Sequence, residues 1–212
     1  MDSSLQTYKQ KTIKYWWIDG LAEIAFGFEM WTLAICLLLS HLFNVFEWGV
    51  LFASIGIPLL FIISIFGVGK VVKILKERIT YPRTGYVRYP KRQSISRLRR
   101  LIIGGGIGFS TAILVNLALV YFGPAARWTI IGLIMMMTMI YIASVNGVNR
   151  YYLTGILTFF WGISMIWIPA PESTLFGWFF AGVGMIFFLS GLIVFIRYLQ
   201  RYPKIEGDEY VG

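Results

Sequence analysis

Six long apolar runs separated by short polar segments make up most of this chain. They cover residues 15–41, 48–74, 101–122, 128–145, 151–168 and 175–199. A helix that crosses the hydrocarbon core of a bilayer needs about 20 predominantly apolar residues. The pattern therefore predicts an all-α, polytopic integral membrane protein, with six transmembrane helices arranged as three hairpins.

The polar segments complete this organisation. We expect residues 15–199 to form one six-helix transmembrane domain, preceded by a short segment (1–14) and followed by a tail (200–212). The longest connection is a strongly basic loop, 75–100, between the second and third runs. Pro58 falls inside the second run and predicts a kink there, because proline removes one helical hydrogen bond.

The distribution of positive charge predicts the orientation. With six spans, both termini lie on the side of the basic loop, and every lysine and arginine except Arg127 then falls on that side. Cytoplasmic loops of membrane proteins carry such an excess of lysine and arginine. We therefore expect cytoplasmic termini, and as location the cytoplasmic membrane of a prokaryote.

Composition agrees with the membrane class and excludes others. Apolar residues make up 58% of the 212 positions and charged residues 14%, against about 25% charged in soluble domains. The net charge of +9 is confined to the flanks of apolar runs, so we expect anionic lipid headgroups as partners and no nucleic acid. The single cysteine, Cys36, excludes a disulfide within the chain. The first run is too long for a cleaved signal peptide, and we expect it to remain as an anchor.

Three carboxyl groups in the first run are the main functional candidates. Asp19 and Glu23 are four residues apart, and Glu29 lies nearer the centre of the run. Ionisable groups at membrane depth are costly and are functional candidates by default. If a helix starts near Tyr15, Asp19 and Glu23 share one face, and Glu29 points to a different neighbour. We expect these three residues to bind a proton or cation.

A structural role for the same acids remains open. Asp19 and Glu23 would then pair with a basic side chain at similar depth, such as Lys14, Lys70, Lys73 or Arg100. No base stands at the depth of Glu29. Its expected partners are Asn116, Thr138, Ser164 or a bound ion.

A Tyr-Pro-basic tripeptide occurs three times on the predicted inner side. It begins at Tyr81, Tyr89 and Tyr202, and the sequence from Lys76 to Arg83 resembles the sequence from Arg197 to Lys204. Tyrosine, proline and a base suit a helix exit at the headgroup level, and the same residues suit docking of a partner protein. The candidate contacts with lipid or a partner are Arg78, Tyr81, Arg83, Arg88, Tyr89, Lys91, Arg92, Tyr202 and Lys204.

The remaining motifs indicate packing and not chemistry. Gly104, Gly108 and Ala112 fall on one face of the third run and predict close helix packing. The only histidine, His41, lies at the outer end of the first run, opposite to the end where most polar groups are expected, so we expect no catalytic residues, no metal site and no cofactor.

Two functions from different classes follow from these residues. The first is a small proton- or cation-coupled transporter or channel that uses the carboxyl groups of the first helix. The second is a non-catalytic, membrane-embedded structural or regulatory subunit that presents a basic cytoplasmic surface to anionic lipid, to a partner membrane protein or to further copies of the chain.

Overall fold

The computed structural model describes residues 17–43, 55–84 and 126–203, with isolated helical positions at 113, 116–117 and 120–121. Within these ranges all regular structure is helical, and no strand occurs. The elements are α2 (Leu21–Phe43), α4 (Ile57–Leu75), the π-helical turn η2 (Lys76–Thr80), α5 (Tyr81–Thr84), α7 (Ala126–Asn146), α8 (Arg150–Ser164), the 3₁₀ turn η3 (Met165–Trp167) and α9 (Glu172–Arg201).

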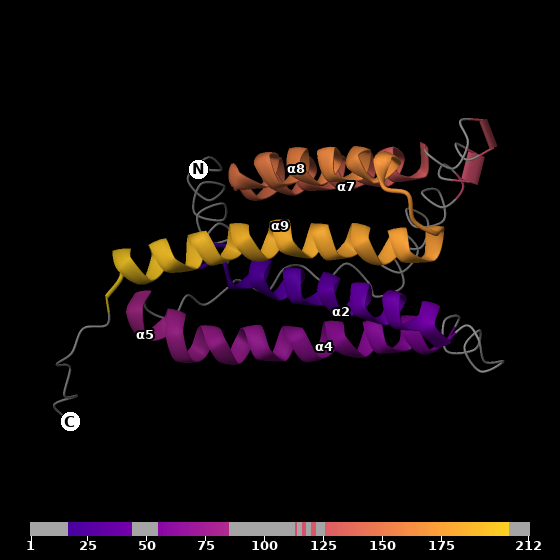
Figure 1. Ribbon diagram of the computed structural model, residues 1–212. Helices are drawn as coiled ribbons and strands as arrows, with labels where there is room; N and C mark the ends of the chain where they lie inside the picture. Colours follow the sequence, from indigo (N-terminus) through magenta and orange to yellow (C-terminus); the bar gives the residue numbers. More distant parts are fainter. Residues whose placement is uncertain are drawn as a thin grey trace, which may run out of the picture.

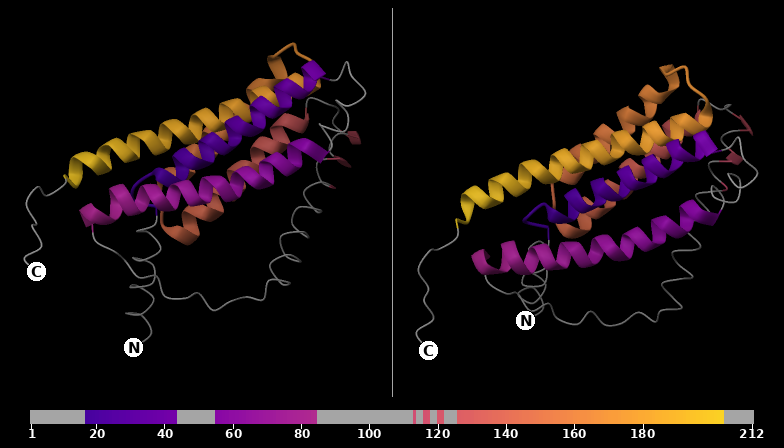
Figure 2. Two further views of the ribbon diagram at one scale, coloured as in Figure 1. Left: turned by 90° about the horizontal axis from the view of Figure 1, so that it is seen from below. Right: turned by 60° about the horizontal axis from the view of Figure 1, so that its bottom comes forward.

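The long helices pack in a row and not in chain order. Helix α7 packs on α8, α8 on α9, α9 on α2, and α2 on α4. Figures 1 and 2 show the α7–α8 pair on one side of α9, with α2 and then α4 on the other. Since α9 contacts both α2 and α8, elements from the amino-terminal and carboxy-terminal halves of the chain meet along this helix.

Close contact between α2 and α9 depends on small residues. A Cβ on Gly191 of α9 would lie 2.8 Å from the carbonyl oxygen of Gly20. A larger residue at position 191 would therefore push the two backbones apart. Farther along, a Cβ on Gly27 would lie 2.8 Å from the carbonyl oxygen of Gly184. Glycine at such contacts is typical of helix pairs in membranes, where close van der Waals packing replaces the hydrophobic effect.

Two tryptophans fix α9 between its neighbours. The indole of Trp31 on α2 donates a hydrogen bond to the carbonyl of Ala181, at 3.1 Å. The indole of Trp161 on α8 donates to the carbonyl of Phe179, also at 3.1 Å. The core follows the same helix, with Phe179, Val183 and Phe187 almost fully buried.

The outer surfaces of these helices are apolar. On α4, for example, Phe66 is 70% exposed and Ile63 is 58% exposed. In the described part of the chain, three helical stretches are long and apolar enough to cross a bilayer: Leu21–Leu39, Arg127–Asn146 and Thr174–Arg201. The apolar helices indicate a membrane location.

The boundaries differ from the sequence prediction mainly at the first run. Residues 17–20 form a turn and α2 begins only at Leu21, because Gly20 takes a left-handed conformation, with φ of +70°. Pro58 lies in the first turn of α4 within the described residues. A proline costs little there, because the first N–H groups of a helix have no partner within the helix. The turn between α7 and α8 falls at Gly147, with φ of +66°, within the expected turn. The third run lies largely outside the described residues.

Candidate functional site

Asp19 is fully buried in the turn before α2 and uses both of its carboxylate oxygens. The amine of Lys76 lies 2.8 Å from Oδ2 and donates to Oδ1 at 3.1 Å. The hydroxyl of Thr80 donates to Oδ2 at 2.9 Å, and the backbone N–H of Leu21 donates to Oδ1 at 3.2 Å. Asp19 therefore joins the start of α2 to the end of α4.

Lys76 is buried as deeply as its partner. Its side chain is 2% exposed and that of Asp19 is 0% exposed. Burial lowers the pKa of the Lys76 amine, because a charge is costly away from water, and the charge and hydrogen bond of Asp19 oppose this effect. A pair of this kind stabilises the fold only while both members are present.

Glu23 connects α2 to two other helices. Nε of Arg150, the first residue of α8, donates to Oε1 of Glu23 at 2.7 Å, and Nη2 of Arg150 pairs with the same oxygen. The hydroxyl of Ser190 on α9 donates to Oε2 at 3.2 Å. Nη2 of Arg150 also donates to the carbonyl of Trp17. One guanidinium thus joins the start of α8, the start of α2 and the turn before it.

Glu29 has a different environment. It is 5% exposed, and its Oε1 is hydrogen-bonded to the hydroxyl of Ser64 on α4. That hydroxyl also lies 2.9 Å from the carbonyl oxygen of Phe61. Oε2 of Glu29 has no hydrogen-bond partner among the residues that the structure describes. A buried oxygen without a partner is rare in folded proteins and calls for an explanation.

The structure thus places the three predicted acids on different neighbours. The expectation that Asp19 and Glu23 share a helical face is wrong, because α2 begins after Asp19. Their bases are Lys76 and Arg150, and neither is among the four partners expected from depth. Of those four, Lys73 pairs at 3.9 Å with Glu77 at the surface and Lys70 is exposed, while Lys14 and Arg100 lie outside the described residues.

Sequence reasoning also missed the partner of Glu29. Ser64 lies on α4, whereas the expected partners were on other runs. A signal was present, because Ser64 is a polar residue in the middle of the apolar second run. Arg150 offered a similar signal, as an isolated base in the five-residue segment between the fourth and fifth runs.

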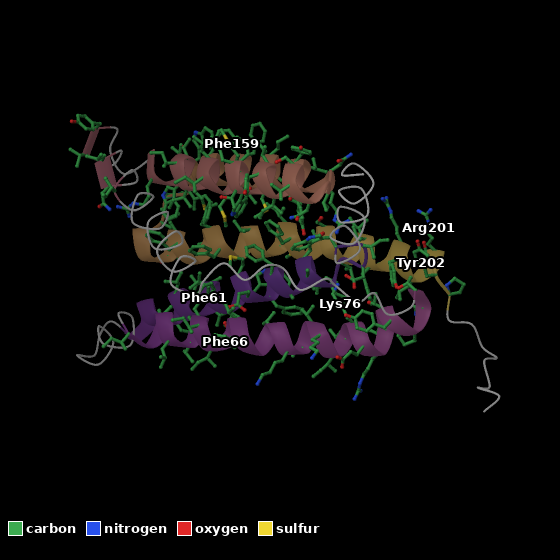
Figure 3. The ribbon with its side chains drawn as sticks, turned by 180° about the vertical axis from the view of Figure 1, so that it is seen from behind. Phe61, Phe66, Lys76, Phe159, Arg201 and Tyr202 are labelled. Carbon is green, nitrogen blue, oxygen red and sulfur yellow. The ribbon has the colours of Figure 1, made fainter. Side chains whose placement is uncertain are left out.

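Lys76, Arg150 and Arg201 lie at one end of the bundle, which we call the basic end. Two copies of the Tyr-Pro-basic tripeptide contact each other there. Arg83 donates to the carbonyl of Tyr202 at 3.4 Å. Figure 3 shows Lys76, Arg201 and Tyr202 toward this end and Phe61 and Phe66 farther along α4. The similar segments after α4 and within α9 therefore adjoin in space.

Only some of the other predicted contact residues lie in the described part of the chain. Arg78 is exposed, and Tyr81 and Tyr202 are half-buried. The remaining lipid or partner candidates and the packing candidates lie outside the described residues, namely Arg88, Tyr89, Lys91, Arg92, Lys204, Gly104, Gly108 and Ala112. In the described ranges, no three histidine, cysteine or acidic side chains gather in a way that would hold a metal ion.

No family model, curated protein or solved structure matches this chain.

Proposed function

We propose that the protein is a six-span membrane protein with cytoplasmic termini that binds and releases a proton at Glu29 and couples this step to transport. The observation that carries the proposal is the buried Glu29 carboxyl, with one oxygen on Ser64 and the other without a partner among the residues that the structure describes. An acid at this depth is expensive to bury in its charged form.

The hydrogen-bonding capacity of Ser64 fits both the protonated and the ionised form of Glu29. A serine hydroxyl has one hydrogen to donate, yet Ser64 has two oxygen neighbours, the Phe61 carbonyl and Oε1 of Glu29. With a protonated carboxyl, Glu29 donates to Ser64 and Ser64 donates to Phe61. With an ionised carboxyl, the Ser64 hydroxyl turns and donates to Glu29. Both states of Glu29 thus keep a hydrogen bond, as binding and release require.

The described ligand set favours a proton over a metal cation. Hard cations take about six or more oxygen ligands. In the described part of the chain, Ser64 is the one side chain that offers a hydrogen bond to Glu29, and no ion pair involves this acid. One proton needs only a single acceptor, which the described residues already supply.

The two ion pairs form a contact between helices that would separate and re-form during transport. Glu29 lies six residues after Glu23, about 9 Å farther along α2 at 1.5 Å per residue. Between Glu29 and the basic end, Glu23–Arg150 attaches α2 to α8, and Asp19–Lys76 attaches it to the end of α4. We propose that release of the proton to the cytoplasm requires separation of at least one of these pairs.

The proposed topology places the ion pairs on the cytoplasmic side. Helix α7 separates Arg127 from Arg150 by a span of about 30 Å, the thickness of the hydrocarbon core. Lys76, Arg83, Arg150 and Arg201 would then all face the cytoplasm, as the excess of positive charge there requires.

Proton flux into liposomes tests this function. Purified protein is reconstituted with a pH-sensitive dye inside, and a potassium diffusion potential drives proton entry. We expect faster acidification than in empty liposomes, and loss of that excess in Glu29→Gln. Glu77→Gln is the matched control, because Glu77 is exposed at the surface. Unchanged proton and cation flux in Glu29→Gln would exclude this role for Glu29.

One observation favours the second function, a structural or regulatory subunit. Asp19 pairs with the buried Lys76 and Glu23 with the half-buried Arg150, as expected if these acids only hold helices together. Purification of the intact protein from its native membrane in mild detergent separates the two functions. A stoichiometric partner protein supports the subunit, and a homogeneous monomer or homo-oligomer argues against it.

A further inference from the structure

A groove at the basic end is lined by none of the three acids. It has a volume of about 150 Å³ and opens beside the last two turns of α9. Its lining comes from the turn before α2 and from α9, and consists of Ile18, Val194, Arg197, Tyr198, Arg201 and Tyr202. The groove therefore combines two guanidinium groups with an apolar end.

The two arginines are available to an anion. Arg197 and Arg201 are one helical turn apart and both are exposed, so their side chains lie on one face of α9. Among the described residues no carboxylate pairs with either of them. Guanidinium groups bind phosphate oxygens through paired N–H donors, and two of them on one face suit a single phosphate.

Tyr198, which lines the groove beside the two arginines, is held in place by its own contacts. The hydroxyl of Tyr198 donates to the carbonyl of Thr80 at 3.2 Å and lies 3.1 Å from the hydroxyl of Thr84. The ring of Tyr198 lies 5.1 Å from that of Tyr202. The groove is therefore formed before any ligand arrives, which reduces the entropy lost on binding.

The apolar end of the groove identifies the kind of phosphate. Val194 lies one turn from Tyr198 toward the middle of α9, and Ile18 faces the same space. A ligand with a phosphate at one end and a hydrocarbon chain at the other fills both parts. A free phosphate ion would leave the apolar part empty.

We propose that this groove binds the phosphate of an anionic phospholipid, with Arg197 and Arg201 on the phosphate and the first part of the lipid chain against Val194 and Ile18. The inference requires the membrane location but not proton transport. It differs from general attraction of lipid to the basic end, because it assigns one lipid to one pair of arginines.

Native mass spectrometry of the purified protein in detergent tests the assignment, with phosphatidylglycerol as the probe. We expect one tightly bound lipid per chain in the wild type. In Arg197→Gln/Arg201→Gln this lipid should bind at least ten-fold more weakly, since a base near an anionic headgroup contributes about 1 kcal/mol and two contribute about 2 kcal/mol. Val194→Phe should also weaken binding, because it fills the apolar end without changing charge.

Lys70→Gln/Arg78→Gln is the matched control, because it removes two exposed charges that do not line the groove. Unchanged binding in this control supports the groove. Equal weakening in both double variants would overturn the proposal in favour of a diffuse surface attraction. Displacement of the lipid by millimolar inorganic phosphate would overturn it in favour of a free-phosphate site.

Discussion

Asp19 and Lys76 form an ion pair at 2.8 Å in which neither side chain is more than 2% exposed. The two residues are 57 positions apart, so the pair joins the first described helix to the end of the second. A buried pair of this kind contributes most through the penalty for breaking it, since the remaining charge is left without a partner.

Lys76→Met is expected to destabilise the fold by about 3–5 kcal/mol, the usual cost of removing one member of a buried pair. Asp19→Asn together with Lys76→Met should cost clearly less than the two single changes added, because no charge remains unpaired. The measurement is the unfolding midpoint in detergent. Lys73→Met, which removes an exposed base, is the control and should shift the midpoint little. Additive single effects would show that Asp19 and Lys76 do not interact.

Arg150→Lys should destabilise the protein although the charge is kept. The guanidinium donates both to Glu23 and to the carbonyl of Trp17, and a lysine amine lacks this planar fork. We expect a loss of about 1.5–3 kcal/mol, the range for one hydrogen bond to a charged group. The check is chemical unfolding monitored by tryptophan fluorescence. A variant as stable as the wild type would show that one contact suffices.

Gly182→Ala is expected to disrupt the contact between α8 and α9. A Cβ at this position would fall within the indole ring of Trp161, and overpacking of a close contact costs about 1–3 kcal/mol. Gly69→Ala is the control, because a Cβ there would meet nothing within 4 Å. That change should be neutral or slightly stabilising, since alanine favours helix. The measurement is the thermal unfolding midpoint of both variants. Equal midpoints would contradict close packing of Gly182 against Trp161.

Hydropathy and charge were sufficient for the helical class, for the membrane location and for the turn at Gly147. They could not place the start of α2, because the left-handed conformation of Gly20 leaves no trace in an apolar pattern. Hydropathy also gives no order of packing, since lipid-facing and buried faces of membrane helices are equally apolar. The hairpin predicted for the fifth and sixth runs already placed α9 beside α8, whereas the adjacency of α9 to α2 came only from the structure.

The candidate acids were visible in the sequence, but their partners were not. A carboxylate at membrane depth is conspicuous because it is rare. The choice of Lys76 and Arg150 over other bases depends on which helices adjoin and where each one ends. The hairpin predicted for the first two runs already placed α4 beside α2, but hydropathy does not show that Ser64 faces Glu29.

The most direct test of the central claim is infrared difference spectroscopy of the protein in lipid vesicles during a pH titration. A protonated carboxyl has a carbonyl stretch that an ionised one lacks, so the state of Glu29 can be observed without a transport substrate. We predict such a band in the wild type, its loss as the pH is raised, and its absence from Glu29→Gln, with an altered position in Ser64→Ala. A wild-type spectrum without the band, or the same titrating band in Glu29→Gln, would contradict proton binding at Glu29.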